Sequence, residues 1–156
     1  MKRLILFLIS VLLLIFVGGC GSDAIPVVKV SGSVTYRGEP LADALVTFHP
    51  TAAGGRAAAG MSKEDGSFQL MTQGACINGC LPGSYGVTIS KTILVDRQGN
   101  PIVFSTEEPP PGSPTGQRPE SRSILPAKYE NVATSGLTAV VHPKKNNPFV
   151  FDLQRE

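Results

Sequence analysis

The sequence predicts an all-β protein, an antiparallel β-sandwich of about seven short strands that follows an N-terminal signal segment. Three observations lead to this prediction. Hydrophobic residues alternate with polar ones in several short stretches, which is the pattern of half-buried strands. Seventeen glycines and thirteen prolines are spread among these stretches, as expected for turns. After residue 19, no long segment repeats its apolar residues with the 3.6-residue period of a helix.

Residues 1–19 have the composition of a secretory signal peptide. Lys2 and Arg3 give the segment a positive start, and Leu4–Val17 is an apolar run that only Ser10 interrupts. As a helix this run reaches about 21 Å, whereas the hydrocarbon core of a bilayer is roughly 30 Å thick. The run is therefore too short for a permanent membrane span and indicates a signal peptide.

Val17, Gly18, Gly19 and Cys20 resemble the bacterial lipobox, in which an aliphatic residue and two small ones precede a cysteine. The resemblance implies that the thiol of Cys20 receives a diacylglycerol, that the signal peptidase cuts before it and that the new amine is acylated. Several acyl chains give stable anchoring, whereas one holds a protein only marginally. The alternative is an ordinary signal peptide with a chance cysteine. Gly21 is not Asp, which by resemblance to lipoprotein sorting favours the outer membrane over the inner one.

The rest of the chain divides into a lipid-anchored linker, residues 20–26, and one domain, residues 27–156. Without residues 1–19 the chain has twelve basic and twelve acidic residues, so its formal charge is balanced. No basic stripe is present, and we expect no nucleic acid partner.

The first half of the domain contains four predicted strands. The first lies in Val27–Gly38, with Gly32 as a candidate bulge and one apolar face made by Val28, Val30, Val34 and Tyr36. The second, residues 44–50, faces inward through Ala44, Val46 and Phe48. A third lies around Ala57–Met61. A turn at Asp65-Gly66 then precedes a fourth strand that carries Phe68 and Leu70.

The second half is less regular. A fifth strand follows Gly83 and faces inward through Tyr85, Val87 and Ile89. Residues 96–123 are predicted to form a long, exposed, Pro-rich loop, because proline cannot donate a backbone hydrogen bond to a sheet. Residues 124–131 are expected to return irregularly to the domain, and two last strands follow within residues 136–143 and 147–154.

These elements resemble the carboxypeptidase regulatory-like domain, an immunoglobulin-like sandwich of the transthyretin-like type that is common in secreted bacterial proteins. The features that match are Gly32, Val34, the turn at Gly38, Pro40 and Leu41, then Ala44, Val46, Phe48, Asp65, Gly66, Phe68, Pro82, Gly83, Tyr85, Val87 and Ile89. The later motifs LPAKY at Leu125–Tyr129 and FDL at Phe151–Leu153 are similar to those of small lipoproteins built on this domain. The resemblance implies a scaffold and no particular reaction.

Few residues have the spacing of a catalytic or metal site. His49 and His142 each precede a proline at a predicted strand end, and a pair without a third ligand is a weak metal site. Ser62–Gly66 has oxygen-bearing side chains like those of a calcium-binding loop. However, Lys63 lies among the candidate ligands, and position twelve counted from Ser62 is Gln73, not glutamate. We therefore predict no catalytic residue, no metal and no cofactor.

Cys76 and Cys80 are a pair of reactive side chains that lie close together in the sequence. Outside the cytoplasm, two thiols four positions apart between glycines are expected to form a disulfide. In the loop-entropy account, such a small ring stabilises the fold by about 2 kcal/mol. A redox pair or a metal clip is the alternative, although the spacing is not that of a CxxC motif.

We therefore expect a non-enzymatic, lipid-anchored module of the cell envelope that presents a binding surface to a protein or glycan partner. The Pro-rich residues 107–119 and the tip at Cys76–Cys80 are candidate contact points, because loops commonly carry function. One alternative is a structural protein whose edge strands pair into envelope assemblies. The other is a small hydrolase that uses His49 or His142.

Overall fold

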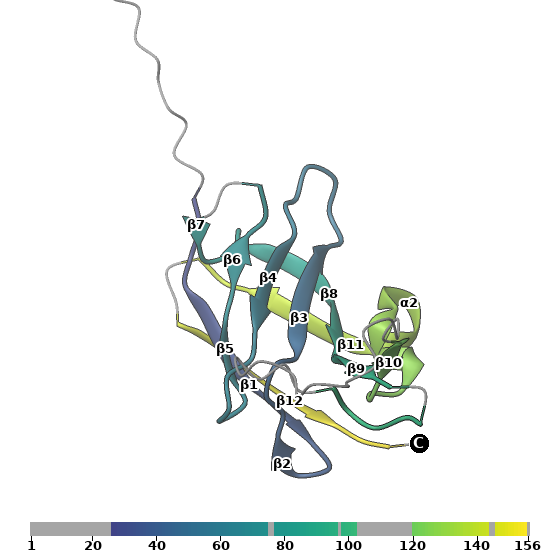
Figure 1. Ribbon diagram of the computed structural model, residues 1–156. Helices are drawn as coiled ribbons and strands as arrows, with labels where there is room; N and C mark the ends of the chain where they lie inside the picture. The colour runs from purple at the N-terminus through teal and green to yellow at the C-terminus, as the bar shows by residue number, and fades with distance from the viewer. Residues whose placement is uncertain (1–25, 75–76, 97, 103–119, 144–145, 156) are drawn as a thin grey trace, which may run out of the picture.

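The computed structural model describes residues 26–74, 77–96, 98–102, 120–143 and 146–155. Two β-sheets pack against each other, and this confirms the predicted all-β sandwich (Figure 1). Residues 1–25, which include the signal segment and Cys20, lie outside the described residues, and so do residues 103–119 of the predicted Pro-rich loop. In the part of the chain that is described, no helix has the length and hydropathy needed to cross a bilayer.

The smaller sheet is built around β1 (Val30–Tyr36). This strand pairs in parallel with β12 (Asn147–Leu153) and antiparallel with β2 (Glu39–Pro40) and β5 (Ser67–Gln69). The parallel pair departs from the predicted antiparallel arrangement. Its two strands are the first and the last of the described domain, so no tight turn joins them and no short-range pattern predicts their direction.

The larger sheet is antiparallel throughout. Its strand order is β11 (Leu137–Val141), β8 (Gly83–Ser90), β3 (Leu45–Pro50), β4 (Ala58–Met61), β6 (Met71–Thr72) and β7 (Ile77–Asn78). A separate antiparallel pair joins β9 (Thr92–Val95) and β10 (Glu120–Ser123).

The described residues thus contain twelve strands, where the sequence predicted about seven. Part of the excess comes from β2, β6 and β7, whose two residues are too short for an alternating pattern. The strand β10 is a correction to the predicted loop at 96–123, because four exposed polar residues pair there with β9 although no apolar alternation marks them.

The core lies between the sheets and contains the residues that alternation selected. Ala44, Val46 and Phe48 of the second predicted strand are fully buried. Phe48 meets Phe149 and Phe151 of β12 edge-on, with ring centroids 5.4 and 6.2 Å apart. Burying an aromatic side chain of this size contributes about 1.5–3 kcal/mol, so these contacts between the sheets are a main stabilising element.

Gly32 is not the bulge that the sequence suggested. It keeps the ladder register on both sides, opposite Phe149 in β12 and Phe68 in β5. A Cβ at this position would lie 2.2 Å from the carbonyl oxygen of Phe149 and 2.6 Å from Cζ of Phe68. Glycine stands here because the ring of Phe68 occupies the space that a side chain needs.

The predicted irregular return at residues 124–131 contains a 3-10 helix, η1 (Ala127–Glu130), which a short helix, α2 (Val132–Ser135), follows. The side chain of Asn131 accepts a hydrogen bond from the backbone of Ala133 and caps α2. Val132 lies against Gly86, where a Cβ would be 2.6 Å from its methyl group, so α2 covers part of the outer face of the larger sheet.

The sandwich has two ends. The end formed by β7, the starts of β1 and β12 and the ends of β3 and β11 is called the β7 end (Figure 1). The opposite end, where β1 turns into β2 and where β3 begins, is called the β2 end. The described chain starts at Pro26 near the β7 end, because Val28 pairs with Cys80, two residues beyond β7.

Candidate binding groove

A groove of about 500 Å³ lies at the β7 end, on the outer side of the smaller sheet. β1 runs along its middle. Val28 exchanges two backbone hydrogen bonds of 2.9 Å with Cys80, and the amide of Leu70 donates to the carbonyl of Val30. On the other side of β1, Val30 and Ser31 face Asn147 and Pro148 of β12. The groove is thus built from four segments, namely Lys29–Ser31, Gln69–Leu70, Asn78–Gly79 and Asn146–Pro148.

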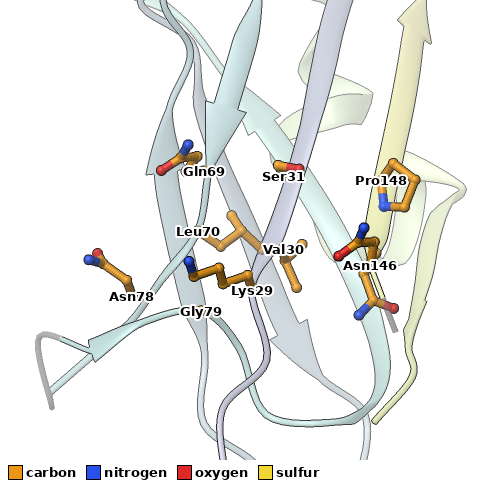
Figure 2. Close-up of a pocket in the computed structure, with 10 residues that line it drawn as sticks. Lys29, Val30, Ser31, Gln69, Leu70, Asn78, Gly79, Asn146 and Pro148 are labelled. Atoms are coloured by element: carbon orange, nitrogen blue, oxygen red, sulfur yellow. The ribbon is translucent and has the colours of Figure 1, made fainter. Parts of the chain in front are cut away.

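The rim of the groove is polar. Val30 and Leu70 lie beneath it in the core and are each only 2% exposed. The rim consists of exposed polar side chains, namely Lys29, Ser31, Gln69, Asn78 and Asn146. Figure 2 shows Lys29 and Asn78 on one side of β1 and Asn146 with Pro148 on the other.

The rim side chains are available to a ligand. Within the described part of the chain, none of the five has a side-chain hydrogen bond to another protein group. An ammonium group and three carboxamides can together donate up to nine hydrogen bonds and accept several more. This arrangement suits a ligand with many polar groups, and the volume lies in the range typical of ligand pockets, roughly 300–1,000 Å³.

Asn147 holds the β12 side of the groove in place. Its side chain is 6% exposed, accepts a 2.8 Å hydrogen bond from the amide of His142 and donates one of 3.1 Å to the His142 carbonyl. These bonds join the end of β11 to the start of β12. They thereby position the neighbouring residues Asn146 and Pro148, which line the groove.

Gly79 and Thr72 hold the opposite side. The buried hydroxyl of Thr72 donates a 2.8 Å hydrogen bond to the carbonyl of Gly79. Gly79 has a φ of 124°, and a Cβ there would lie 2.5 Å from the carbonyl oxygen of Val28. Only glycine allows this close approach, which places Asn78 beside Lys29.

A second hollow, of about 360 Å³, continues the groove toward the β2 end. The two hollows share Ser31, Gln69 and Pro148. Ser33 and Ser67 face each other across β1 and β5, and their small side chains leave the space for this second hollow. Val150 borders it and is 74% exposed, which is unusual for a large aliphatic residue. Together the hollows form one elongated surface along β1.

The structure does not bring His49 and His142 together. His49 in β3 is paired with Gly86, which is paired with Thr138 in β11, and His142 lies four residues beyond Thr138. This register separates the backbone of His49 from that of His142 by about 10 Å across the strands and about 14 Å along them. Nε2 of His49 instead lies 2.9 Å from the hydroxyl of Thr88. Among the described residues there is no group of three or more His, Cys, Asp or Glu that could hold a metal ion.

Cys80 is buried and is present as a free thiol in this structure. Its expected partner, Cys76, lies outside the described residues, so the bridge stays a prediction. Burial raises the pKa of the Cys80 thiol above its usual value. Burial also raises the pKa of the nearby Tyr85, whose hydroxyl donates a 2.8 Å hydrogen bond to the carbonyl of Leu81. Both groups are therefore protonated at neutral pH.

The remaining predicted site residues, Val17, Gly18, Gly19 and Cys20, lie outside the described residues, as does the Pro-rich segment 107–119. The groove itself was missed by sequence reasoning. Its residues come from Lys29–Ser31, Gln69–Leu70, Asn78–Gly79 and Asn146–Pro148, and no local motif connects them. The one sequence signal is the Asn-Asn-Pro run at 146–148, which looks the same as any polar turn.

Comparison with known proteins adds little. No protein-family model matches the chain, and no curated protein matches it. Among solved structures, the chain is similar to a 9R-lipoxygenase from Cyanothece PCC8801, with 10% identity and a TM-score of 0.35. That match covers 86% of this chain, and the chain spans only 17% of the lipoxygenase.

Proposed function

We propose that this protein is a non-enzymatic, lipid-anchored β-sandwich of the cell envelope that binds a glycan partner through the groove at its β7 end. One observation supports the binding role most directly. Five exposed polar side chains line one hollow, and none of them is hydrogen-bonded to another group of the described chain. Polar side chains on the outside of a domain commonly face water, but here they converge on one hollow.

A glycan fits this groove better than a protein partner does. Protein interfaces usually depend on aromatic or arginine side chains that fill pockets, and neither type lines the hollow of about 500 Å³ at the β7 end. Carboxamides both donate and accept hydrogen bonds, as sugar hydroxyls do, so Gln69, Asn78 and Asn146 can pair with neighbouring hydroxyls in either direction. The sandwich then acts as a rigid support for the polar rim.

The anchoring part of the proposal comes from the sequence. Cys20 in its lipobox-like context is proposed to be acylated, and Gly21–Pro26 then connects the lipid to the sandwich over at most roughly 20 Å. This distance keeps the β7 end close to the membrane. The resemblance to the carboxypeptidase regulatory-like domain supports a scaffold of this type, and the outer membrane is the proposed location.

A glycan-binding screen with the whole protein purified in detergent tests the binding role. We expect at least one class of polysaccharide to bind, and we expect the double variant Gln69→Ala, Asn78→Ala to lose most of that affinity. A matched control is the double variant Gln73→Ala, Gln98→Ala, which removes two exposed glutamines outside the groove. No binding to any glycan, or an equal loss in both double variants, would exclude the proposed role of the groove.

A second experiment tests the anchor separately. Growth with radioactive palmitate should label the wild-type protein, and Cys20→Ser should abolish the label and release the domain from the membrane fraction. Absence of label on the wild type would remove the anchor from the proposal and leave the groove untouched.

A structural role in envelope assembly is the second candidate, and one observation favours it. Leu45 and Met61 face each other across β3 and β4 and are 42% and 59% exposed, and Met71 lies diagonally beside them at 44%. Exposed apolar clusters of this kind often mediate protein contacts. Sedimentation at increasing concentration should show oligomers if assembly is the function, and a monomer at all concentrations would exclude it.

A further inference from the structure

We infer that the ligand of the groove is an acidic glycan, that is, a polysaccharide strand with carboxylate or phosphate groups. The inference rests on the proposed function and narrows it to one chemical class. Three observations support it, namely the length of the groove, the neutral polar character of most of its rim and the distribution of charge on the sandwich.

The groove is longer than a single charged group requires. The hollows of about 500 and 360 Å³ share three residues and follow the outer face of β1 from Lys29 to Ser33. Four residue steps along a strand cover about 13 Å. A ligand that fills this surface must be extended, with polar groups repeated along its length. A polysaccharide strand has this form.

Most of the rim is neutral. Ser31, Gln69, Asn78 and Asn146 have hydroxyl or carboxamide groups, which can donate hydrogen bonds to the hydroxyls of a sugar chain and accept hydrogen bonds from them. A phospholipid headgroup, by contrast, presents one phosphate, and sites for such groups usually contain several Lys or Arg residues. A single cation among four neutral side chains therefore favours a chain of sugars with an acidic substituent.

Lys29 is that cation, and no described carboxylate competes for it. Its ammonium lies on the same side of the groove as Asn78 (Figure 2). At the β7 end Arg56, in the β3–β4 connection, adds a second exposed positive charge outside the groove. The described carboxylates lie toward the β2 end or on the β9–β10–η1 extension, namely Glu39, Asp43, Glu64, Asp65, Asp96, Glu120, Glu130 and Asp152.

Among the described residues, the charged side chains at the β7 end are therefore the cations Lys29 and Arg56. A positive surface raises the association rate of an anionic ligand and selects it against a neutral one. If the proposed anchor holds this end close to the membrane, the acidic glycan is one that reaches the membrane surface. The sandwich would then bind the glycan to the membrane.

Calorimetry with the whole protein in detergent tests the inference. The probes are oligogalacturonate, a neutral glucan oligosaccharide of the same length, and glycerophosphoglycerol, the soluble headgroup of phosphatidylglycerol. We expect oligogalacturonate to bind about tenfold more tightly than the neutral chain and the difference to shrink as salt is raised. Lys29→Gln should remove most of this preference, because it weakens binding of oligogalacturonate much more than binding of the neutral chain. Arg56→Gln, which removes a charge at the same end but outside the groove, should have at most a twofold effect.

The outcomes separate the inference from the proposed function. Equal affinity for the acidic and the neutral chain would overturn the inference and leave the groove a glycan site. Headgroup binding as tight as that of oligogalacturonate would overturn the inference in favour of a lipid. If none of the probes binds and the glycan screen is also empty, both the inference and the proposed function are wrong. An equal effect of Lys29→Gln and Arg56→Gln would show general charge attraction in place of a site at Lys29.

Discussion

The phenolic oxygen of Tyr129 exchanges two hydrogen bonds with the backbone of Gln154. It accepts a bond of 3.0 Å from the Gln154 amide and donates one of 3.2 Å to the Gln154 carbonyl. Tyr129 ends the LPAKY motif, and Gln154 follows directly after the FDL motif. The structure thus joins the two motifs that extended the family resemblance beyond the domain core. The contact closes the sandwich at the C-terminal end of β12.

Replacing Tyr129 by Phe should destabilise the protein by about 1 kcal/mol, because the ring stays in the core while two part-buried backbone groups of Gln154 lose their partner. Urea denaturation measures the change. Tyr36→Phe is a matched control, since the Tyr36 side chain is half-buried and has no hydrogen bond from its hydroxyl within the described chain. If the two variants lose the same stability, the Tyr129–Gln154 contact contributes nothing specific.

Gly32→Ala should destabilise the fold by about 3 kcal/mol or more, since the new Cβ clashes with a backbone oxygen and with the ring of Phe68. A backbone atom in a paired strand cannot move aside as a flexible side chain can. Denaturation of the purified variant, or its absence from the soluble fraction, is the measurement. Ser33 is the next residue of the same strand and points to its outer face. Ser33→Ala should therefore change the free energy of unfolding by less than about 0.5 kcal/mol. A Gly32→Ala variant as stable as wild type would mean that β1 is not paired on both sides.

Asn146 and Asn147 are adjacent but should differ when each is replaced by Ala. Asn147→Ala removes a buried side chain that bridges β11 and β12, so we expect a loss of about 1–3 kcal/mol together with weaker ligand binding. Asn146→Ala removes an exposed rim group, so stability should be unchanged and only binding should weaken. Thermal melts and calorimetry on both variants separate the two effects. Equal stability of the two variants would contradict the positioning role of Asn147.

These neighbours also show what the sequence could and could not predict. Alternation identified the inward faces of β1, β3 and β8 correctly, because a strand buries every second residue whatever its partner. Pairing between distant strands has no such local signature, so the parallel β1–β12 pair was not predicted. The groove follows from that pairing, since Asn146 approaches Lys29 only through it. A buried, hydrogen-bonded Asn147 cannot be told from an exposed turn asparagine by sequence alone.

The turn at Asp65 should make the free energy of unfolding depend on pH in the acidic range. The amide of Ser67 donates a 2.9 Å hydrogen bond to the Asp65 carboxylate, and the hydrogen bonds from Ser67 lower the pKa of Asp65 below its ordinary value of 3.8. A lowered pKa in the folded state stabilises the fold above about pH 4, and this contribution is lost as the pH falls through the folded-state pKa. Asp65→Asn keeps an acceptor for the turn but cannot titrate. Denaturation from pH 6 to pH 2 should therefore show a steeper loss for wild type, and identical slopes would contradict this role of Asp65.

Thiol titration decides between the predicted Cys76–Cys80 bridge and the free thiol seen at Cys80. In the folded protein we expect no rapid reaction of Cys80 at pH 8, because the thiol is buried and burial raises its pKa, and only the thiolate is nucleophilic. After denaturation without a reductant, a bridged protein with an acylated Cys20 should show no thiol at all. Two reactive thiols under these conditions would exclude the bridge and leave Cys80 as a small buried core residue. Cys80→Ala should then lower the free energy of unfolding only slightly. In a bridged protein the same substitution should lower it by about 2 kcal/mol, because the ring that the disulfide closes is lost.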